Sequence, residues 1–207
     1  MALARLPVSL AAAGIFVFSA SLAHAQVPSA AAVAINQATS VVGFTIFGSS
    51  LFKIKRDGQF RSFTGEVSYD PAHPADTHVD LTVYTESVDM HNLDHDRLLK
   101  SGEFFDVEHF PTMHFESTAT QAKPDGSFSM TGDMTIRGIT KRLTIPVSLR
   151  RLSNNLSNAV FETTFPVDRT DFGLNGVPSW NGLRVSISKN VQIHIAIATA
   201  LKAGQQH

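Results

Sequence analysis

An alternation of apolar and polar residues with a period of two recurs along most of this chain and constrains its fold. In the run 191–198, Val191 and the isoleucines share one face while Gln192 and His194 share the other. Such alternation is typical of a β-strand between two different environments, because a helix would mix the two faces. Similar runs lie near 40–48, 58–69, 79–84, 112–122, 127–137, 143–149 and 156–167. The sequence therefore predicts about eight strands.

The links between these runs are short and rich in turn residues, as at Asp70-Pro71 and Pro124-Asp125-Gly126. Short links place consecutive strands antiparallel to each other. Closing eight such strands into a barrel removes the exposed edges that an open sheet or a sandwich keeps. The 15 phenylalanines either fill the interior of such a barrel or line a tunnel in it. We expect an all-β fold, an extended eight-stranded antiparallel β-barrel of the lipocalin-like type.

One short helix interrupts the strand pattern near residues 92–101. Asn92 or Asp94 is suited to cap its first turn, and Leu93, Leu98 and Leu99 are its apolar residues. The helix is expected to end near Ser101-Gly102, where a small residue and a glycine follow the last leucine.

The first 25 residues have the pattern of a cleavable secretory signal. Arg5 precedes an apolar run from Leu10 to Leu22, and Ala23-His24-Ala25 supplies small residues at the cleavage positions. The alternative is an uncleaved N-terminal anchor. We expect export to the periplasm, a signal peptide at 1–25, a linker at 26–34, a barrel domain at 35–200 and a C-terminal tail at 201–207, without stable insertion into a membrane.

Composition excludes several classes of function. The chain has no cysteine, which rules out thiol nucleophiles, iron–sulfur clusters and thiolate zinc sites. Its 17 Lys and Arg against 18 Asp and Glu give a formal net charge of −1, and no basic cluster indicates a nucleic-acid partner.

Motifs for catalysis or metal binding are weak. No nucleophile elbow, phosphate loop or dinucleotide fingerprint occurs. The pair His91 and His95 has the spacing of two metal ligands on a helix, but no third ligand follows at a sequence spacing typical of a metal site. Carboxylate pairs such as Glu103 with Asp106 have no feature that selects them for acid–base chemistry. We therefore expect no enzyme activity, no metal and no cofactor.

Several strings stand in order between Ile35 and Ala198: Ser87-Val88-Asp89, residues 95–111, Phe115-Glu116-Ser117, residues 131–141, and residues 168–174, which read Asp-Arg-Thr-Asp-Phe-Gly-Leu. Together they resemble the YceI-like family, whose members are exported, lipocalin-like, polyisoprenoid-binding barrels. The resemblance implies a tunnel for a long apolar ligand, such as an isoprenoid quinone or a polyprenyl lipid. It is also the only basis for expecting a homodimer.

On this reading the apolar wall and mouth of the tunnel are expected to contain eight aromatic residues, each of which also fits an ordinary core. The polar residues of the matched strings are expected either to pin two loops together through an arginine–carboxylate pair or to contact a ligand head group. Two alternatives remain open, namely a periplasmic enzyme with a polar site inside the barrel and an interaction module whose barrel is filled by its own side chains. The aromatic candidates are Phe44, Phe63, Phe104, Phe105, Phe115, Phe165, Phe172 and Trp180, and the polar candidates are Arg137, Arg169 and Asp171.

Overall fold

Backbone pairing joins eleven antiparallel strands into one sheet, in the order β1-β4-β5-β7-β8-β9-β10-β13-β2-β3-β6. The computed structural model describes residues 32–48, 55–70, 72–151, 159–177, 179–180, 183–184 and 187–199, so the expected signal peptide and C-terminal tail lie outside the described residues. The strands of the sheet are β1 (Ala32–Ala34), β2 (Val41–Phe47), β3 (Lys55–Phe60), β4 (Phe63–Ser68), β5 (His78–Tyr84), β6 (Val88–Asp89), β7 (Thr112–Ala122), β8 (Phe128–Ile136), β9 (Ile139–Arg151), β10 (Ala159–Asp168) and β13 (Asn190–Ala198). The other elements are α1 (Leu93–Lys100), the short hairpin strands β11 (Ser179–Trp180) and β12 (Leu183–Arg184), and the 3-10 turns η1 (Gln37–Thr39), η2 (Pro74–Asp76), η3 (Thr85–Ser87) and η5 (Arg169–Phe172).

Three of the long strands are each broken once, which explains why eleven strands make a barrel of eight. The turn η1 separates β1 from β2, Arg61-Ser62 separates β3 from β4, and η3 separates β5 from β6. The pairs β1 and β2, β3 and β4, and β5 and β6 are each the two parts of one long strand. The strand order begins with β1-β4-β5 and ends with β2-β3-β6, so both ends of the order belong to the same three long strands. The sheet therefore closes on itself, and the expected antiparallel barrel is confirmed with a strand count that differs only by these breaks.

The breaks keep their backbone hydrogen bonds. The amide of Arg61 donates to the carbonyl of Ser87 at 3.1 Å, and the amide of Tyr84 donates to the carbonyl of Ser62 at 3.0 Å. Buried backbone groups that lose a ladder partner must find another, and these bonds supply it. The barrel wall thus bends at each break without leaving these backbone groups unpaired.

β1 lies in the segment for which the composition predicts a linker. Ala32–Ala34 pairs with Glu66–Ser68 of β4, and Ile35 bridges to Thr199 beside the end of β13. Small residues in a linker are also compatible with an edge strand, and backbone pairing decides between the two here. The barrel therefore begins at least three residues before the predicted domain boundary.

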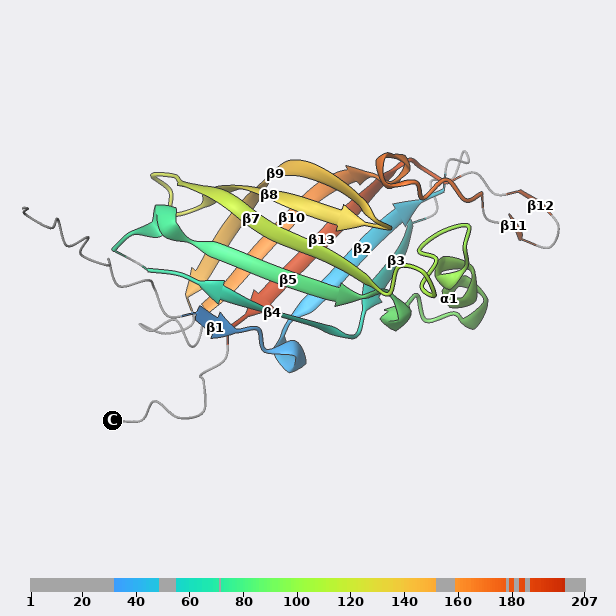
Figure 1. Ribbon diagram of the computed structural model, residues 1–207, viewed down its shortest axis with the longest axis horizontal. Coiled ribbons are helices and arrows are strands. Elements are labelled where there is room, and N and C mark those ends of the chain that lie inside the picture. The colour runs from blue at the N-terminus through green and yellow to red at the C-terminus, as the bar shows by residue number, and fades with distance from the viewer. Residues whose placement is uncertain are drawn as a thin grey trace, which may run out of the picture.

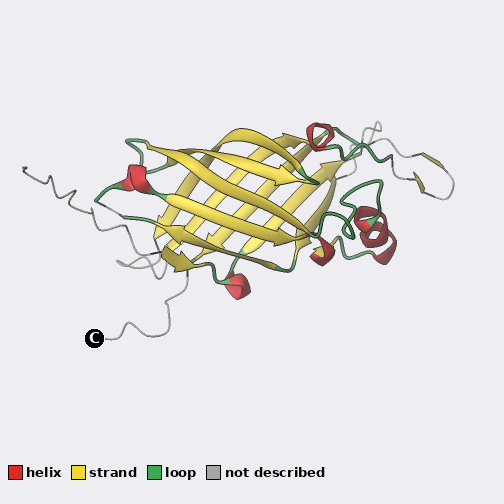
Figure 2. Cartoon of the chain, in the orientation of Figure 1, coloured by secondary structure: helices red, strands yellow, loops and turns green. Residues whose placement is uncertain are grey.

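The molecule is an elongated barrel with different structures at its two ends (Figure 1). The helix α1 and the turn η5 lie at the end where β8 runs into β9, and the turn between β7 and β8 lies at the opposite end (Figure 2). The helix matches the expected insert, since Asn92 caps it by accepting from the amides of Asp94 and His95, each at 3.1 Å. No helix in the described part of the chain is long and apolar enough to cross a membrane.

Inward side chains follow the predicted alternation most regularly in β8, where every second residue from Phe128 to Ile136 is buried. Near the end of the barrel away from α1, the ring of Tyr69 contacts Phe128 at 6.0 Å and Phe161 at 5.7 Å between ring centroids, both edge to face. Aromatic rings prefer this geometry over face-to-face stacking. These three rings make a tightly packed layer of the core.

Removing the Phe128 ring should destabilise the barrel strongly, because Phe128 is only 2% exposed. We expect Phe128→Ala to lower the free energy of unfolding by about 3–5 kcal/mol, as measured by urea denaturation. The matched control is Phe47→Ala, which removes the same atoms from a side chain that is 37% exposed and should cost much less. Equal losses in both variants would contradict this description of the core.

Candidate ligand-binding cavity

The barrel holds an internal cavity of about 140 Å³ in the half that carries α1. All eight long strands contribute to its wall, through β2, β3, β5, β7, β8, β9, β10 and β13. Residues from three loop segments complete it at the α1 end: Leu99, Phe104 and Phe105 after or within α1, Arg169, Phe172 and Leu174 around η5, and Ile187 before β13. The cavity therefore joins the barrel wall to the loops that cover one of its ends.

Six of the eight aromatic residues expected in the wall and mouth of a tunnel line this cavity. Their position is a fact of the structure, while their role as ligand contacts stays a prediction. Of the other two, Trp180 belongs to β11 but its side chain lies outside the described residues. The six are Phe44, Phe104, Phe105, Phe115, Phe165 and Phe172.

Phe63 is buried but does not line the cavity, so its placement in the wall was wrong. It is the first residue of β4, just past the break at Arg61-Ser62, and the cavity wall on the other side of this break is formed by Phe60. Phe60 contacts Phe44 at 5.6 Å and Phe105 at 5.4 Å between ring centroids. The strand alternation alone did not distinguish the two phenylalanines, because it did not reveal the break.

Two of the lining rings lie directly over glycines of neighbouring strands. A Cβ atom at Gly58 would stand 2.4 Å from the Phe44 ring, and one at Gly132 would stand 2.5 Å from the Phe115 ring. Neither distance is compatible with van der Waals contact, so any side chain at these glycines would push the ring away from the wall. The glycines thus leave room for large aromatic rings without closing the cavity.

The cavity wall is almost entirely apolar. Among the described residues that line it, His114 and Arg169 are the only ones with polar side chains. The imidazole of His114 turns to the outer face of the barrel, where Nε2 lies 3.1 Å from Oδ2 of Asp80. That leaves Arg169 as the one polar side chain in the wall.

Arg169 is only 8% exposed, and its guanidinium holds together the loops at the α1 end. Its Nε donates to the carbonyl of Ser188 at 3.2 Å, and its Nη1 donates to the carbonyl of Leu174. Burial lowers the pKa of Arg169, and the charge of the adjacent Asp168 acts against that shift. An arginine stays protonated in proteins even so, and carbonyl partners are what a buried guanidinium requires.

Arg137 clamps two other segments together from the turn between β8 and β9. Its Nη1 donates to the carbonyl of Gly173 at 3.0 Å, and its Nη2 donates to the carbonyl of Gly102 at 2.7 Å. The same Nη2 lies 3.8 Å from Oδ2 of Asp106. One guanidinium therefore connects the loop after α1 to the loop after η5.

The predicted loop-pinning role agrees with the geometry of both arginines, and Arg137 has a carboxylate neighbour in Asp106 rather than in Asp171. Among the described residues, the exposed carboxylate of Asp171 makes no ion pair with Arg137 or Arg169. Backbone carbonyls accept the hydrogen bonds of the two arginines instead, because carbonyls in turns and at the ends of strands have no partner in the β-ladder. Sequence motifs do not display such carbonyls, which is why they were missed.

The two loop phenylalanines are more buried than loop residues usually are. Phe172 is 1% exposed, and the ring of Phe104 would lie 2.5 Å from a Cβ atom at Gly176. Phe105, in contrast, is only partly buried. We call the loop segments that cover the α1 end of the cavity, residues 99–105, 169–174 and 187, the cap. Phe104 and Phe172 are buried within the cap, and Phe105 is its less buried phenylalanine.

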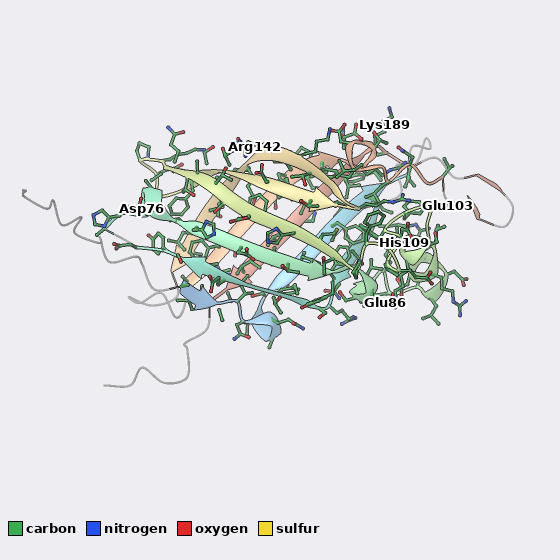
Figure 3. The ribbon with its side chains drawn as sticks, viewed as in Figure 1. Asp76, Glu86, Glu103, His109, Arg142 and Lys189 are labelled. Atoms are coloured by element: carbon green, nitrogen blue, oxygen red, sulfur yellow. The ribbon has the colours of Figure 1, made fainter. Side chains whose placement is uncertain are left out.

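Two histidines with shifted pKa values belong to this end of the molecule, where Figure 3 labels one of them, His109, together with Glu103 and Glu86. Nδ1 of His109 lies 2.8 Å from Oδ1 of Asp106, and this hydrogen bond, together with the carboxylate charge, raises the pKa of His109. For His95, burial lowers the pKa and the charge of Arg56 adds to the shift. No group of three His, Asp or Glu side chains within the described ranges is placed to hold a metal ion.

Fold and cavity together define this chain as a closed antiparallel β-barrel with an apolar interior site for an apolar ligand. A family model described as the YceI-like domain matches residues 34–199. The chain belongs to the YceI-like family, which confirms the resemblance of its ordered motifs.

Relatives of known sequence and structure agree with this assignment. A UPF0312 protein of Pseudomonas paraeruginosa is 36% identical over 120 residues, which are 56% of this chain and 62% of that protein. A UPF0312 protein of Vibrio vulnificus is 39% identical over 88 residues, which are 42% of this chain and 47% of the relative. The matched part of the chain thus covers less than two thirds of the length of each of these curated relatives.

Two solved structures show the same fold. Burkholderia cenocepacia BcnA has a TM-score of 0.67 at 24% identity, covering 79% of this chain and 98% of that chain. A polyisoprenoid-binding domain from Saccharophagus degradans, implicated in plant cell wall breakdown, has a TM-score of 0.61 at 11% identity and covers 79% of this chain and 95% of its own.

Loss of the Arg137 clamp should loosen the cap without unfolding the barrel. We expect Arg137→Gln, which keeps part of the side-chain stem, to speed amide exchange in residues 101–106 and 172–175 by about tenfold, since hydrogen bonds to two carbonyls are lost. Hydrogen–deuterium exchange read by mass spectrometry measures this. Arg142→Gln is the control, because Arg142 pairs with Asp133 on the outer wall, 2.8 Å away, and should leave the cap unchanged.

The contact between Asp106 and His109 predicts a pH dependence of the same loop. Because the pKa of His109 is raised in the folded state, the interaction is fully present below the unfolded value of about 6.5 and is lost as the pH rises through the folded value. An NMR titration should place the His109 pKa above that of a model peptide, and Asp106→Asn should lower it. A pKa unaffected by that substitution would contradict the assignment.

Proposed function

We propose that this chain binds the tail of a long apolar lipid inside the barrel and thereby carries or sequesters it. The proposed ligand class is an isoprenoid quinone or a polyprenyl lipid. The observation that carries the proposal is the cavity, whose wall offers apolar side chains from all eight long strands and, among its described residues, one inward polar side chain, that of Arg169. The structural relative described as a polyisoprenoid-binding domain supports the ligand class.

The cavity volume limits how much of such a ligand enters. A cavity of about 150 Å³ holds a molecule the size of benzene, so the 140 Å³ found here accommodates a short piece of a prenyl tail. A chain of eight isoprene units would need the lining side chains to move or would leave most of its length outside. Binding a long tail in full therefore requires side chains of the cap to move, and Phe105 is the cap phenylalanine that is only partly buried.

Burial of even a short tail provides a useful driving force. Two isoprene units contain ten carbons, and each buried carbon contributes about 0.8 kcal/mol, which gives a gross gain of about 8 kcal/mol. Association and chain ordering oppose this gain by a similar amount. The net affinity is thus expected to be modest, with little discrimination between apolar chains of similar width.

The polar residues favour a structural role over head-group recognition. Nε and Nη1 of Arg169 and both terminal nitrogens of Arg137 already donate to backbone carbonyls. A head group at the α1 end would have to compete with these bonds. We therefore propose that the tail, rather than the head group, supplies most of the binding free energy.

We further propose that the chain is not an enzyme and that it acts after export, with residues 1–25 as the export signal. General acid–base catalysis needs groups that exchange protons near neutral pH, and the cavity wall offers only a guanidinium that keeps its proton. The alternative of a self-filled interaction module is disfavoured because the half of the barrel next to α1 is hollow.

Native purification tests the ligand class. The protein is isolated from the exported fraction without detergent, extracted with organic solvent and analysed by mass spectrometry. We expect a prenylated lipid at near-equal molar ratio to the protein. Recovery of protein with no associated lipid, from cells that make quinones, would contradict the proposal.

A substitution in the cap tests the site. Phe105→Asp should weaken retention of the lipid about tenfold or more, since it replaces an apolar contact worth about 1.5–3 kcal/mol with a charge beside the cavity. Phe105 is preferred to Phe104 and Phe172, because a charge at those fully buried positions would also unfold the cap. Phe47→Asp is the control, since Phe47 is exposed and does not line the cavity.

A further inference from the structure

Inside the barrel, the cavity next to α1 gives way to tightly packed side chains, and the boundary is visible on β10 and β13. On β13, Val191, Ile193 and Ile195 line the cavity, whereas Ile197, the next inward residue, is buried and does not. On β10, Phe165 lines the cavity and Phe161 does not. The cavity therefore ends part of the way along the barrel.

Strand geometry gives the depth of this cavity. From Val191 to Ile195 there are four residue steps, which is about 13 Å along the strand and about 10 Å along the barrel axis at a strand tilt near 40°. An extended prenyl chain advances roughly 5 Å per isoprene unit. The depth therefore corresponds to about two isoprene units, which is more than a benzene-sized volume holds unless the lining side chains move apart.

Beyond the cavity lies a layer of tightly packed side chains. Met130 and Val67 are each 1% exposed, and behind them the rings of Tyr69, Phe128 and Phe161 meet edge to face. We call these five residues the floor. On the far side of the floor, Tyr69 and Phe128 line a second hollow of about 390 Å³ at the end of the barrel opposite α1. The floor thus separates two spaces that would otherwise form a continuous tunnel.

We infer that the floor determines the length of lipid tail that the barrel buries, and that Ile195, the deepest lining residue of β13, marks its upper surface. This inference rests on the proposed function. The last two isoprene units of a tail enter the cavity, and the units nearer the head group stay outside the barrel. Chain length beyond two units therefore adds no affinity.

A series of prenols tests the inference on the full chain. Isopentenol, geraniol, farnesol and geranylgeraniol contain one, two, three and four isoprene units, and their affinities are measured by displacement of a fluorescent apolar probe. We expect affinity to rise roughly tenfold or more from one unit to two, because the second unit is buried, and then to stay constant.

Two substitutions should shift this plateau in opposite directions. Ile195→Phe adds atoms to existing empty space at the floor and should remove the gain from the second unit. Phe161→Ala deepens the cavity and should make farnesol bind more tightly than geraniol. The control Phe105→Ala changes the cap, and should weaken all prenols of two or more units by the same factor without moving the plateau.

The outcomes separate this inference from the proposed function. If no prenol displaces the probe from the wild-type protein, the proposed function fails. If prenols bind and their affinity keeps rising to four units, unchanged by Ile195→Phe, the floor does not limit the ligand and the inference fails while the proposed function stands. Should Phe161→Ala not fold, Ile195→Phe still gives a decisive result, because it fills space instead of creating it.

Discussion

Closure of the sheet is the constraint on which the rest of this structure depends. Strands that wrap into a barrel leave no edge, but every backbone group on the wall then needs a partner. Three of the eight long strands meet this demand while bending, because short turns or two-residue breaks interrupt them and hydrogen bonds across the breaks replace the lost ladder bonds. The break between β3 and β4 also decides that Phe60, and not Phe63, lines the cavity.

Within the closed wall, side-chain size decides where the interior is empty. Glycines at two wall positions let the rings of Phe44 and Phe115 lie flat against neighbouring strands, which leaves space along the axis. Further along the axis, Met130, Val67 and a group of three aromatic rings form a packed layer between this cavity and the second hollow at the opposite end. A barrel of one uniform diameter thus holds both a cavity and a core.

The sequence predicted the strands well because alternation with a period of two is a local property, most clearly in β8 and β13. It also predicted the short helix, whose cap Asn92 is a local signal. It missed the break after Phe60, and so placed Phe63 in the cavity wall. It missed the carbonyl partners of Arg137 and Arg169, since every residue has a backbone carbonyl and the residue type does not show which of them accepts. The position of the cavity depends on contacts between aromatic rings of strands that are far apart in the sequence, and a local sequence pattern does not predict such contacts.

The two ends of this barrel differ in kind, since one is tightly packed aromatic side chains and the other is loops held by two arginines. If the proposed lipid binds, it enters and leaves at the α1 end, because the packed side chains block the other direction, and its polar end stays outside the barrel. On the same proposal, that polar end is accessible to solvent while the tail is buried.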